Sequence, residues 1–296
     1  MIRPVNFSFN TETAVNNAFQ SEGFEENAQE KAAQEFDAFV EILRSANINV
    51  LVVNDTPEPY TPDSIFPNNW ISFHENGIIA LYPMFALNRR LERKKSVLDA
   101  IKEKFDVKDT VDFSFFEQEN QFLEGTGSMV LDRENKIAYA CFSPRTDKIP
   151  FEKFCETFDY QPIAFNAVDE NNQPIYHTNV LMCVADQYVV ICLNAIISQE
   201  EKNAVAQSII ASGKMIIEIS SEQINHFAGN MLQVKNSKGE NLLIMSSQAY
   251  QSLNSEQIKL LEQFNPILHS SLQIIEANGG GSARCMMAEI YLQPKL

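Results

Sequence analysis

The chain has 296 residues, 45% of them hydrophobic, and carries a formal net charge of −16. This length and hydrophobic content are sufficient for a large buried core, in one domain or two. An acidic surface repels phosphate groups and no basic cluster offsets it, so nucleic acids and anionic membranes are not expected as partners.

Further features predict a cytoplasmic protein. The N-terminus lacks the basic and then apolar pattern of a signal peptide, and no apolar run is long enough to cross a membrane. The five cysteines are widely spread and contain no CxxC pair, which predicts neither a disulfide framework nor a zinc site. Cys141, Cys183 and Cys192 lie in apolar runs and are expected to be core residues.

The hydrophobic pattern predicts a helix over residues 26–46, a strand over 49–54, and then a unit of strand, strand, helix and strand that recurs along the chain. The first strands are expected at 68–73, 126–131, 178–184, 229–234 and 283–290, and the second strands at 77–82, 136–142, 188–193 and 241–246. The helices are expected at 88–104, 150–158, 198–212 and 255–264, and the closing strands at 161–168, 214–219 and 272–277.

A polar residue or cysteine opens each first strand at nearly even spacing. These residues are Asn69, Ser128, Asn179, Asn230 and Cys285, which lie 59, 51, 51 and 55 residues apart. One unit cannot bury its own apolar face, so five units are expected to pack around a common axis that these residues face. No linker or low-complexity stretch interrupts the pattern, which predicts a single α/β domain over residues 1–296.

The fifth unit contains NGGGSARC at residues 278–285. Glycines allow a backbone to approach a ligand closely, and a cysteine beside them near the axis is a candidate nucleophile. A plain glycine turn followed by a buried cysteine explains the motif equally well. A phosphate-binding loop is a weaker interpretation, because no GK[ST] sequence follows.

Two other units place titratable residues at the corresponding position. His177 lies in IYHTNV of the third unit, and Glu124 lies in FLEGTGS of the second. Each alone could be structural, the histidine as a buried hydrogen-bonded residue and the glutamate as a surface carboxylate. Brought together at one axis with Cys285, they form a nucleophile, a base and an orienting acid.

The first unit contains PDSIFPNNW at residues 62–70, where Asp63, Asn68 and Asn69 are either turn residues or site residues. The basic segment 88–95 that follows is most simply a solvated helix face. Arg145, in a turn after a strand, is a candidate to bind a carboxylate.

Together these motifs resemble the guanidine-modifying, or pentein, superfamily, over residues 60 to the end. The resemblance implies a five-bladed αβ propeller of ββαβ repeats, with Cys285 as the nucleophile and His177 and Glu124 as its catalytic partners. It also implies that Asp63 contacts the amino-acid end of the substrate. Two arginines would hold the substrate carboxylate, Arg145 and either Arg89 or Arg90.

The sequence departs from the superfamily pattern where relatives carry acids that grip a guanidinium. It has Asn68 and Asn69 in the first unit, and Asn179 two residues after the histidine. In these positions it is most similar to the citrulline-utilisation hydrolases. The resemblance therefore implies a cofactor-free and metal-free hydrolase that acts on the C–N bond of a ureido or guanidino amino acid, such as citrulline.

Other outcomes stay open. An arginine or dimethylarginine hydrolase, an amidinotransferase and a non-catalytic binding protein with the same fold are the alternatives. A cysteine that acts as a redox sensor is a further one. The expected partner is a small amino acid, and a homodimer is one expected assembly.

Overall fold

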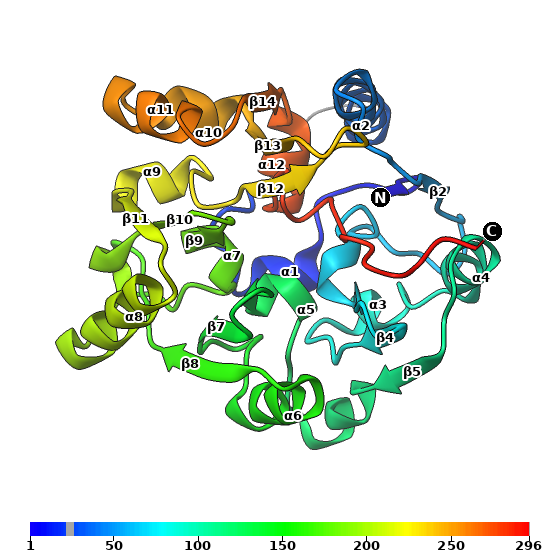
Figure 1. Cartoon of the computed structure of the whole chain (residues 1–296). Coiled ribbons are helices and arrows are strands. Elements are labelled where there is room, and N and C mark those ends of the chain that lie inside the picture. The colour runs from blue at the N-terminus through cyan, green and yellow to red at the C-terminus, as the bar shows by residue number, and fades with distance from the viewer. Residues whose placement is uncertain (22–26, 296) are drawn as a thin grey trace.

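The computed structural model of the protein describes residues 1–21 and 27–295. In these ranges the strands form four three-stranded sheets and one two-stranded sheet. The sheets stand in a ring around the short helices α5 (Gly125–Ser128) and α7 (Thr178–Leu181), with longer helices on the outside (Figure 1). The predicted α/β class is confirmed, and the ring agrees with the expected five-bladed propeller.

Four units share one topology, in which the first two strands are antiparallel and the last two are parallel. The first contains β3 (Ile71–Phe73), β4 (Ile78–Leu81), α3 (Leu87–Arg90), α4 (Lys95–Lys104) and β5 (Asp109–Asp112). The second contains β6 (Val130–Asp132), β7 (Ile137–Cys141), α6 (Lys148–Phe158) and β8 (Gln161–Phe165). The third contains β9 (Met182–Val184), β10 (Tyr188–Ile191), α8 (Gln199–Ala211) and β11 (Met215–Glu218). The fourth contains β12 (Leu232–Lys235), β13 (Asn241–Ser246), α10 (Ser247–Ser252), α11 (Ser255–Glu262) and β14 (Ile267–Ser270).

Both ends of the chain build the fifth unit. Strand β1 (Ile2–Arg3) pairs in parallel with β2 (Val53–Asn54), and helix α2 (Ala28–Ser45) connects them. Apolar side chains of the C-terminal segment, among them Leu292, pack against β1 and β2. Helix α2 confirms the predicted N-terminal helix, apart from residue 26, which lies outside the described residues. Of the strand expected over 49–54, only its last two residues pair.

Two predicted strands are wrong. Residues 272–277 belong mostly to helix α12 (Gln273–Gly279), whose first turn is capped from a distance because the Glu35 carboxylate accepts hydrogen bonds from the backbone of Ile274 and Ile275. Residues 283–290, all of which the structure describes, contain turns and no strand. Cys285 therefore sits in a turn, where its own N–H donates to Ser282 O.

The polar starts of the units are also turns rather than strand ends. Helices α5 and α7 precede β6 and β9, and the 3₁₀ helix η1 (Pro67–Asn69) precedes β3. Their Gly, Ser, Thr and Asn residues favour such tight turns. The remaining elements are α1 (Thr11–Ala14), η2 (Ser114–Glu119), η3 (Leu193–Ala195) and α9 (Ser221–Asn225).

The helix predicted over residues 88–104 is broken between α3 and α4. The interpretation of residues 88–95 as a solvated face is wrong at Arg89, Glu92 and Lys94, which are buried. Lys94 Nζ reaches Asp55 Oδ1 at 2.6 Å, and Arg89 pairs with Glu92. These charged side chains point inward, and each is paired there, as buried charges require.

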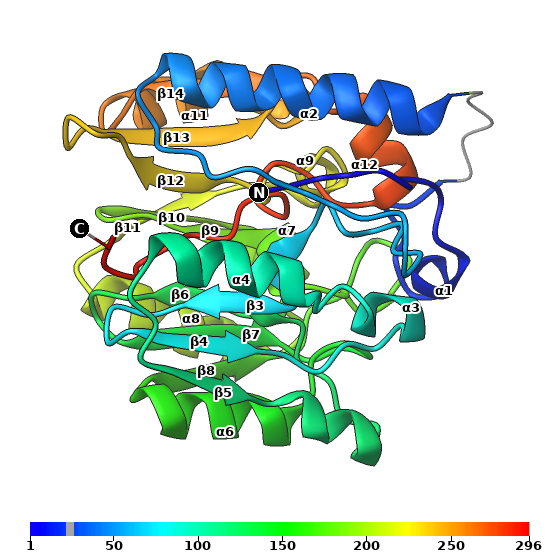
Figure 2. The ribbon, with the colours of Figure 1, turned by 90° about the vertical axis from the view of Figure 1, so that its right-hand side faces the viewer.

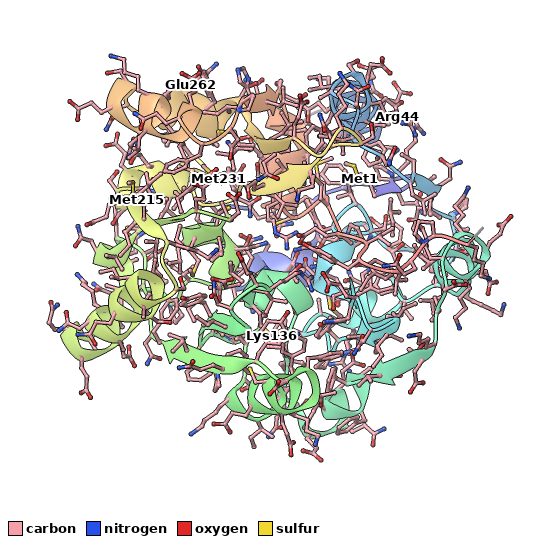
Figure 3. The ribbon with its side chains drawn as sticks, viewed as in Figure 1. Met1, Arg44, Lys136, Met215, Met231 and Glu262 are labelled. Atoms are coloured by element: carbon pink, nitrogen blue, oxygen red, sulfur yellow. The ribbon has the colours of Figure 1, made fainter. Side chains whose placement is uncertain are left out.

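The apolar core follows the ring. The labelled side chains in Figure 3 mark its limits: Met231 is buried in the core, whereas Arg44, Met215 and Glu262 lie on the outer rim. In α2 the buried residues recur every three to four positions and include Phe36, Phe39 and Val40, as an amphipathic helix requires. Among the described residues, no helix is long and apolar enough to cross a membrane.

The five cysteines are all free thiols and all buried. Burial raises the pKa of Cys141 and of Cys183 to about 12, and it also raises the pKa of Cys192. These three residues lie in the core as predicted.

His74 ties protein stability to pH. It stacks on Phe158 of α6 with 3.8 Å between ring centroids, and Nε2 lies 2.9 Å from Ser72 Oγ. Burial, with Arg133 and Lys136 nearby, lowers its pKa from 6.5 to about 3. Below pH 6.5 His74 is protonated in the unfolded chain but stays neutral in the folded chain. The free energy of unfolding therefore decreases as the pH falls below 6.5.

We predict that His74→Phe, which keeps the ring stack, removes part of this acid sensitivity. Between about pH 7 and about pH 4.5 the wild type should lose roughly 2–3 kcal/mol more unfolding free energy than the variant. Urea unfolding at both pH values measures the difference, and His226→Gln at an exposed position is the control. Equal losses in wild type and variant would contradict the prediction.

Candidate active site

The polar residues that begin the units meet near the middle of the ring. Asn179 Nδ2 and Asn230 Nδ2 lie 3.4 and 3.3 Å from Cys285 Sγ. Asn69 Nδ2 and His177 Nδ1 both pack against the bare Cα of Gly127. Helices α1 and α12 lie at the same end of the ring (Figure 2). This convergence is the one that the spacing of the units predicts.

Cys285 is held by its turn and faced by two amide donors. The Asn230 amide is itself fixed, because its Oδ1 accepts the N–H of Arg284 and its Nδ2 also donates to Asn179 O. Two N–H groups directed at the sulfur stabilise negative charge on it. Sequence reasoning identified Asn230 only as the start of a unit; its even spacing was the signal that could have placed it at the sulfur.

His177 and Glu124 form a buried pair, with 2.8 Å between Nε2 and Oε2. Burial lowers the pKa of His177 to about 4, although the Glu124 carboxylate opposes this. Burial disfavours the charged form of Glu124, but Arg145, His177 and Arg89 outweigh it and hold its pKa at about 2. The imidazole is therefore neutral near pH 7, with Nε2–H donating to Glu124 and Nδ1 available as a base.

The Glu124 carboxylate is surrounded by a hydrogen-bond donor and two arginines. Its Oε1 accepts the N–H of Phe85 at 3.0 Å, and its Oε2 lies 3.6 Å from Arg145 Nη1 and 3.8 Å from Arg89 Nη1. It lies behind His177 and orients the imidazole. Of the three expected catalytic residues, Cys285 and His177 line the cavity described next, and Glu124 supports them.

A small cavity adjoins these groups. It is lined by Thr13, Asn17, Asp63, Phe66, Asn69, Arg89, Arg145, Tyr176, His177, Gly279, Gly280, Gly281 and Cys285. The N-terminal segment with helix α1 covers it, a contribution that no periodicity in the sequence indicates. The three glycines matter here: a Cβ on Gly281 would lie 2.9 Å from the Phe66 ring and 3.3 Å from Cys285 Cβ.

Asp63 and Arg145 lie at the end of the cavity that α1 covers. Asp63 Oδ2 accepts from Asn10 Nδ2 at 2.7 Å and from Thr13 Oγ1 at 3.2 Å. Its Oδ1 is buried without a hydrogen-bond partner among the described residues. Arg145 Nη2 donates to Thr13 O at 2.7 Å, and Nε donates to Asn16 Oδ1 at 2.8 Å. Burial raises the pKa of Asp63, and Arg89 opposes the shift.

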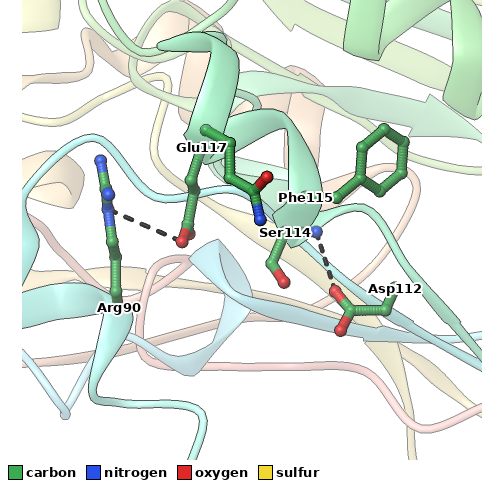
Figure 4. Close-up of a pocket in the computed structure, with 6 residues that line it drawn as sticks. Arg90, Asp112, Ser114, Phe115 and Glu117 are labelled. Carbon is green, nitrogen blue, oxygen red and sulfur yellow. Dashed lines mark hydrogen bonds and ion pairs between the residues drawn. The ribbon is translucent and has the colours of Figure 1, made fainter.

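The two alternative arginines of the first unit point in different directions. Arg89 enters the cavity, but Arg90 points away from it, donates to Met84 O and lies 3.7 Å from Glu117 in an outer surface cavity (Figure 4). Asn68 and Asn179 are buried beside the site: Asn68 Nδ2 reaches Thr126 Oγ1 at 3.3 Å, and the Asn179 amide reaches the cysteine.

A metal site is not formed by the part of the chain that the structure describes: no three His, Cys, Asp or Glu side chains there lie together as ligands. The chemistry available is that of a thiol, a neutral imidazole with its carboxylate, and oriented amides.

We predict that Gly127→Ala lowers turnover by the Cys285–His177 site about a hundredfold, the loss typical of a small displacement at a reacting centre. A Cβ there would lie 2.7 Å from His177 Nδ1 and nearer still to Asn69 Nδ2, so one of them must move. Steady-state kinetics measure the loss, and an unchanged melting temperature shows that the fold is kept. Full activity would show that neither group needs its present position.

Solved structures with the same fold include the arginine dihydrolase ArgZ from the ornithine–ammonia cycle in cyanobacteria. The apo form of ArgZ matches with a TM-score of 0.74 and 17% identity over 100% of this chain and 42% of ArgZ. The chain thus spans less than half the length of ArgZ. The N-terminal domain of ArgZ, as a Cys-to-Ser variant bound to substrate, matches with a TM-score of 0.75 and 18% identity over 99% of this chain and 98% of that domain. This domain is also known covalently bound to a reaction intermediate.

A further structure of this fold is dimethylarginine dimethylaminohydrolase, as a His-to-Gly variant carrying an adduct with S-methyl-L-thiocitrulline. It matches with a TM-score of 0.65 and 12% identity over 96% of both chains. No curated protein matches the chain by sequence. The family described as N,N dimethylarginine dimethylhydrolase, eukaryotic, matches residues 3–292. The chain therefore belongs to this family of hydrolases, within the guanidine-modifying pentein superfamily.

Proposed function

We propose that the protein hydrolyses a C–N bond of a ureido or guanidino amino acid through a covalent intermediate on Cys285, and that a ureido group, as in citrulline, is preferred. Family membership supports the reaction class, and so does the cavity that joins Cys285 to the His177–Glu124 pair. The orientation of the Asn69 amide supports the preference.

The reaction follows from these groups in two halves. In the first, the Cys285 thiol gives its proton to His177, the sulfur bonds to the trigonal carbon, and the double-bond electrons move to the oxygen. When the oxygen electrons return, the C–N bond breaks and the leaving nitrogen takes the proton from His177. In the second half, His177 removes a proton from water and the resulting hydroxide bonds to the same carbon. The C–S bond then breaks, and the Cys285 sulfur takes the proton from His177, which restores the thiol and the neutral imidazole.

Asn69 can present only its donor to the substrate. Its Oδ1 accepts from Arg89 Nη1 at 2.9 Å, and an arginine has nothing but donors, so the amide cannot be reversed without losing this bond. Its Nδ2 is buried beside the cavity without a partner among the described residues. A donor there complements the ureido oxygen, particularly as that oxygen gains negative charge. It would face only further donors on a guanidinium.

Asn179 complements the other side of a ureido group. Its Nδ2 donates to Cys285 Sγ, so its Oδ1 is left as an acceptor, and this oxygen is buried without a partner in the described chain. A ureido group offers N–H donors as well as an oxygen, which matches this pair of amides. The carboxylate of Glu124, by contrast, is already engaged by His177 and Phe85 N.

Asp63 and Arg145 would hold the amino-acid end of the substrate. Arg145 lines the cavity and would bind a substrate carboxylate while its Nη1 stays near Glu124 Oε2, at 3.6 Å, and the unpartnered Asp63 Oδ1 suits an ammonium group. The same Asp63 oxygen favours the second candidate, arginine or a methylated arginine, because a carboxylate could accept from a guanidinium. The family name and ArgZ point to such substrates as well. An amidinotransferase would differ only in using an amine in place of water.

We predict that Cys285→Ser abolishes turnover while the protein stays folded, because almost no serine hydroxyl is ionised near neutral pH. Intact-mass measurement during turnover should show an adduct on the wild type that is absent from the variant. Cys192→Ser is the matched control, since its new hydroxyl would lie near Ser221 Oγ. Wild-type activity in Cys285→Ser would refute the proposed reaction.

We also predict that the double variant Asn69→Asp, Asn179→Asp shifts preference from citrulline toward arginine, because carboxylates accept from a guanidinium and repel a ureido oxygen. The measurement is kcat/KM for citrulline, arginine, methylated arginines and agmatine in both proteins. A wild type that processes arginine more efficiently than citrulline would overturn the ureido preference and leave the second candidate.

A further inference from the structure

We propose that Glu92 is a specificity-determining positioning residue, which fixes through Arg89 the face of the Asn69 amide that the substrate meets. This inference rests on the proposed function, because it explains how one protein selects a ureido group. It also gives Arg89 a role in addition to the expected one of holding the substrate carboxylate.

The Glu92 carboxylate binds the Arg89 guanidinium bidentately, through Nε and Nη2. Arg89 Nε lies 2.9 Å from Glu92 Oε1, and Arg89 Nη2 lies 3.1 Å from Glu92 Oε2. Arg89 Nη2 also lies 3.3 Å from Phe66 O. Both side chains are buried, with exposed fractions of 2% and 0%. The bidentate contact with Glu92 fixes the plane of the Arg89 guanidinium, and it thereby fixes the direction in which the Nη1 group points.

The remaining Nη1 group points to the reacting end of the cavity. It donates to Asn69 Oδ1 and thereby turns Asn69 Nδ2 toward the space that it shares with His177 Nδ1 over Gly127. One N–H of Nη1 takes part in none of these bonds. Arg89 can therefore still join Arg145, which also lines the cavity, in binding a substrate carboxylate.

Glu92 is needed because two other carboxylates compete for Arg89. Asp63 Oδ2 lies 3.8 Å from Arg89 Nε, and Glu124 Oε2 lies 3.8 Å from Arg89 Nη1. Without the charge on Glu92, the guanidinium would turn toward these carboxylates and release Asn69 Oδ1. The Asn69 amide could then rotate and offer its oxygen, which suits a guanidinium.

The test is Glu92→Gln, which keeps the shape and removes the charge. The ratio of kcat/KM for citrulline to that for arginine should fall about tenfold, the effect of one misdirected hydrogen bond. In an Asn69→Ala background the same substitution should leave the ratio unchanged. Arg89→Lys, which cannot reach both partners at once, should lower the ratio as well and serves if Glu92→Gln does not fold. An equal fall with and without Asn69 would overturn the proposal.

A second readout needs no activity. The side-chain amide signals of Asn69, assigned in a ¹⁵N spectrum by their loss in Asn69→Ala, should shift and broaden in Glu92→Gln. Glu117→Gln is the matched control, because Glu117 holds Arg93 at 2.7 and 2.9 Å in the same way but outside the cavity. Unchanged Asn69 signals would overturn the positioning role. A wild type without turnover of any of these amino acids, together with altered signals, would refute the proposed function and keep the positioning role.

Discussion

A short sheet with one helix against it leaves its other face apolar, and this constraint organises the whole molecule. Each unit can cover that face only with its neighbours, so the units close into a ring. Closure needs a fifth unit, which neither end of the chain contains alone. Strands β1 and β2 with helix α2 supply one part, and the segment after Cys285 supplies the other. The same closure brings the last polar start, Cys285, against Asn179 and Asn230 from two other units.

Closing the ring creates a second constraint at its centre, because polar groups there lose water and must find partners in the protein. The carboxylates of Glu92 and Glu124 are met by Arg89, Arg145 and His177. Burial raises the pKa of Glu92 and Arg89 opposes the shift, whereas the several partners of Glu124 lower its pKa. Three of the buried polar atoms left without partners in the described residues, Asp63 Oδ1, Asn69 Nδ2 and Asn179 Oδ1, belong to residues at the cavity or beside Cys285, where a substrate would supply the partners.

The sequence could predict which residue types converge, but not how each is presented. Even spacing placed Cys285, His177 and Glu124 together because every unit starts with a turn at the same level of the ring. The strand expected over residues 272–277 forms a helix because its apolar run suits either structure, and the deciding contact comes from the distant Glu35. Arg89 and Arg90 are adjacent in sequence, so only the packing of helix α3 decides which one points inward.

The side-chain amide of Asn69 shows why residue type alone does not determine which substrate group such a site binds. A carboxamide offers a donor on one side and an acceptor on the other, so the same residue can complement opposite groups. Which side faces the ligand depends on the bond made behind it, and here that bond comes from Arg89. Arg89 in turn is directed by Glu92, which does not itself line the cavity. Selectivity between a neutral and a cationic group would therefore be set two side chains away from the reacting carbon, in the buried salt bridge between Arg89 and Glu92.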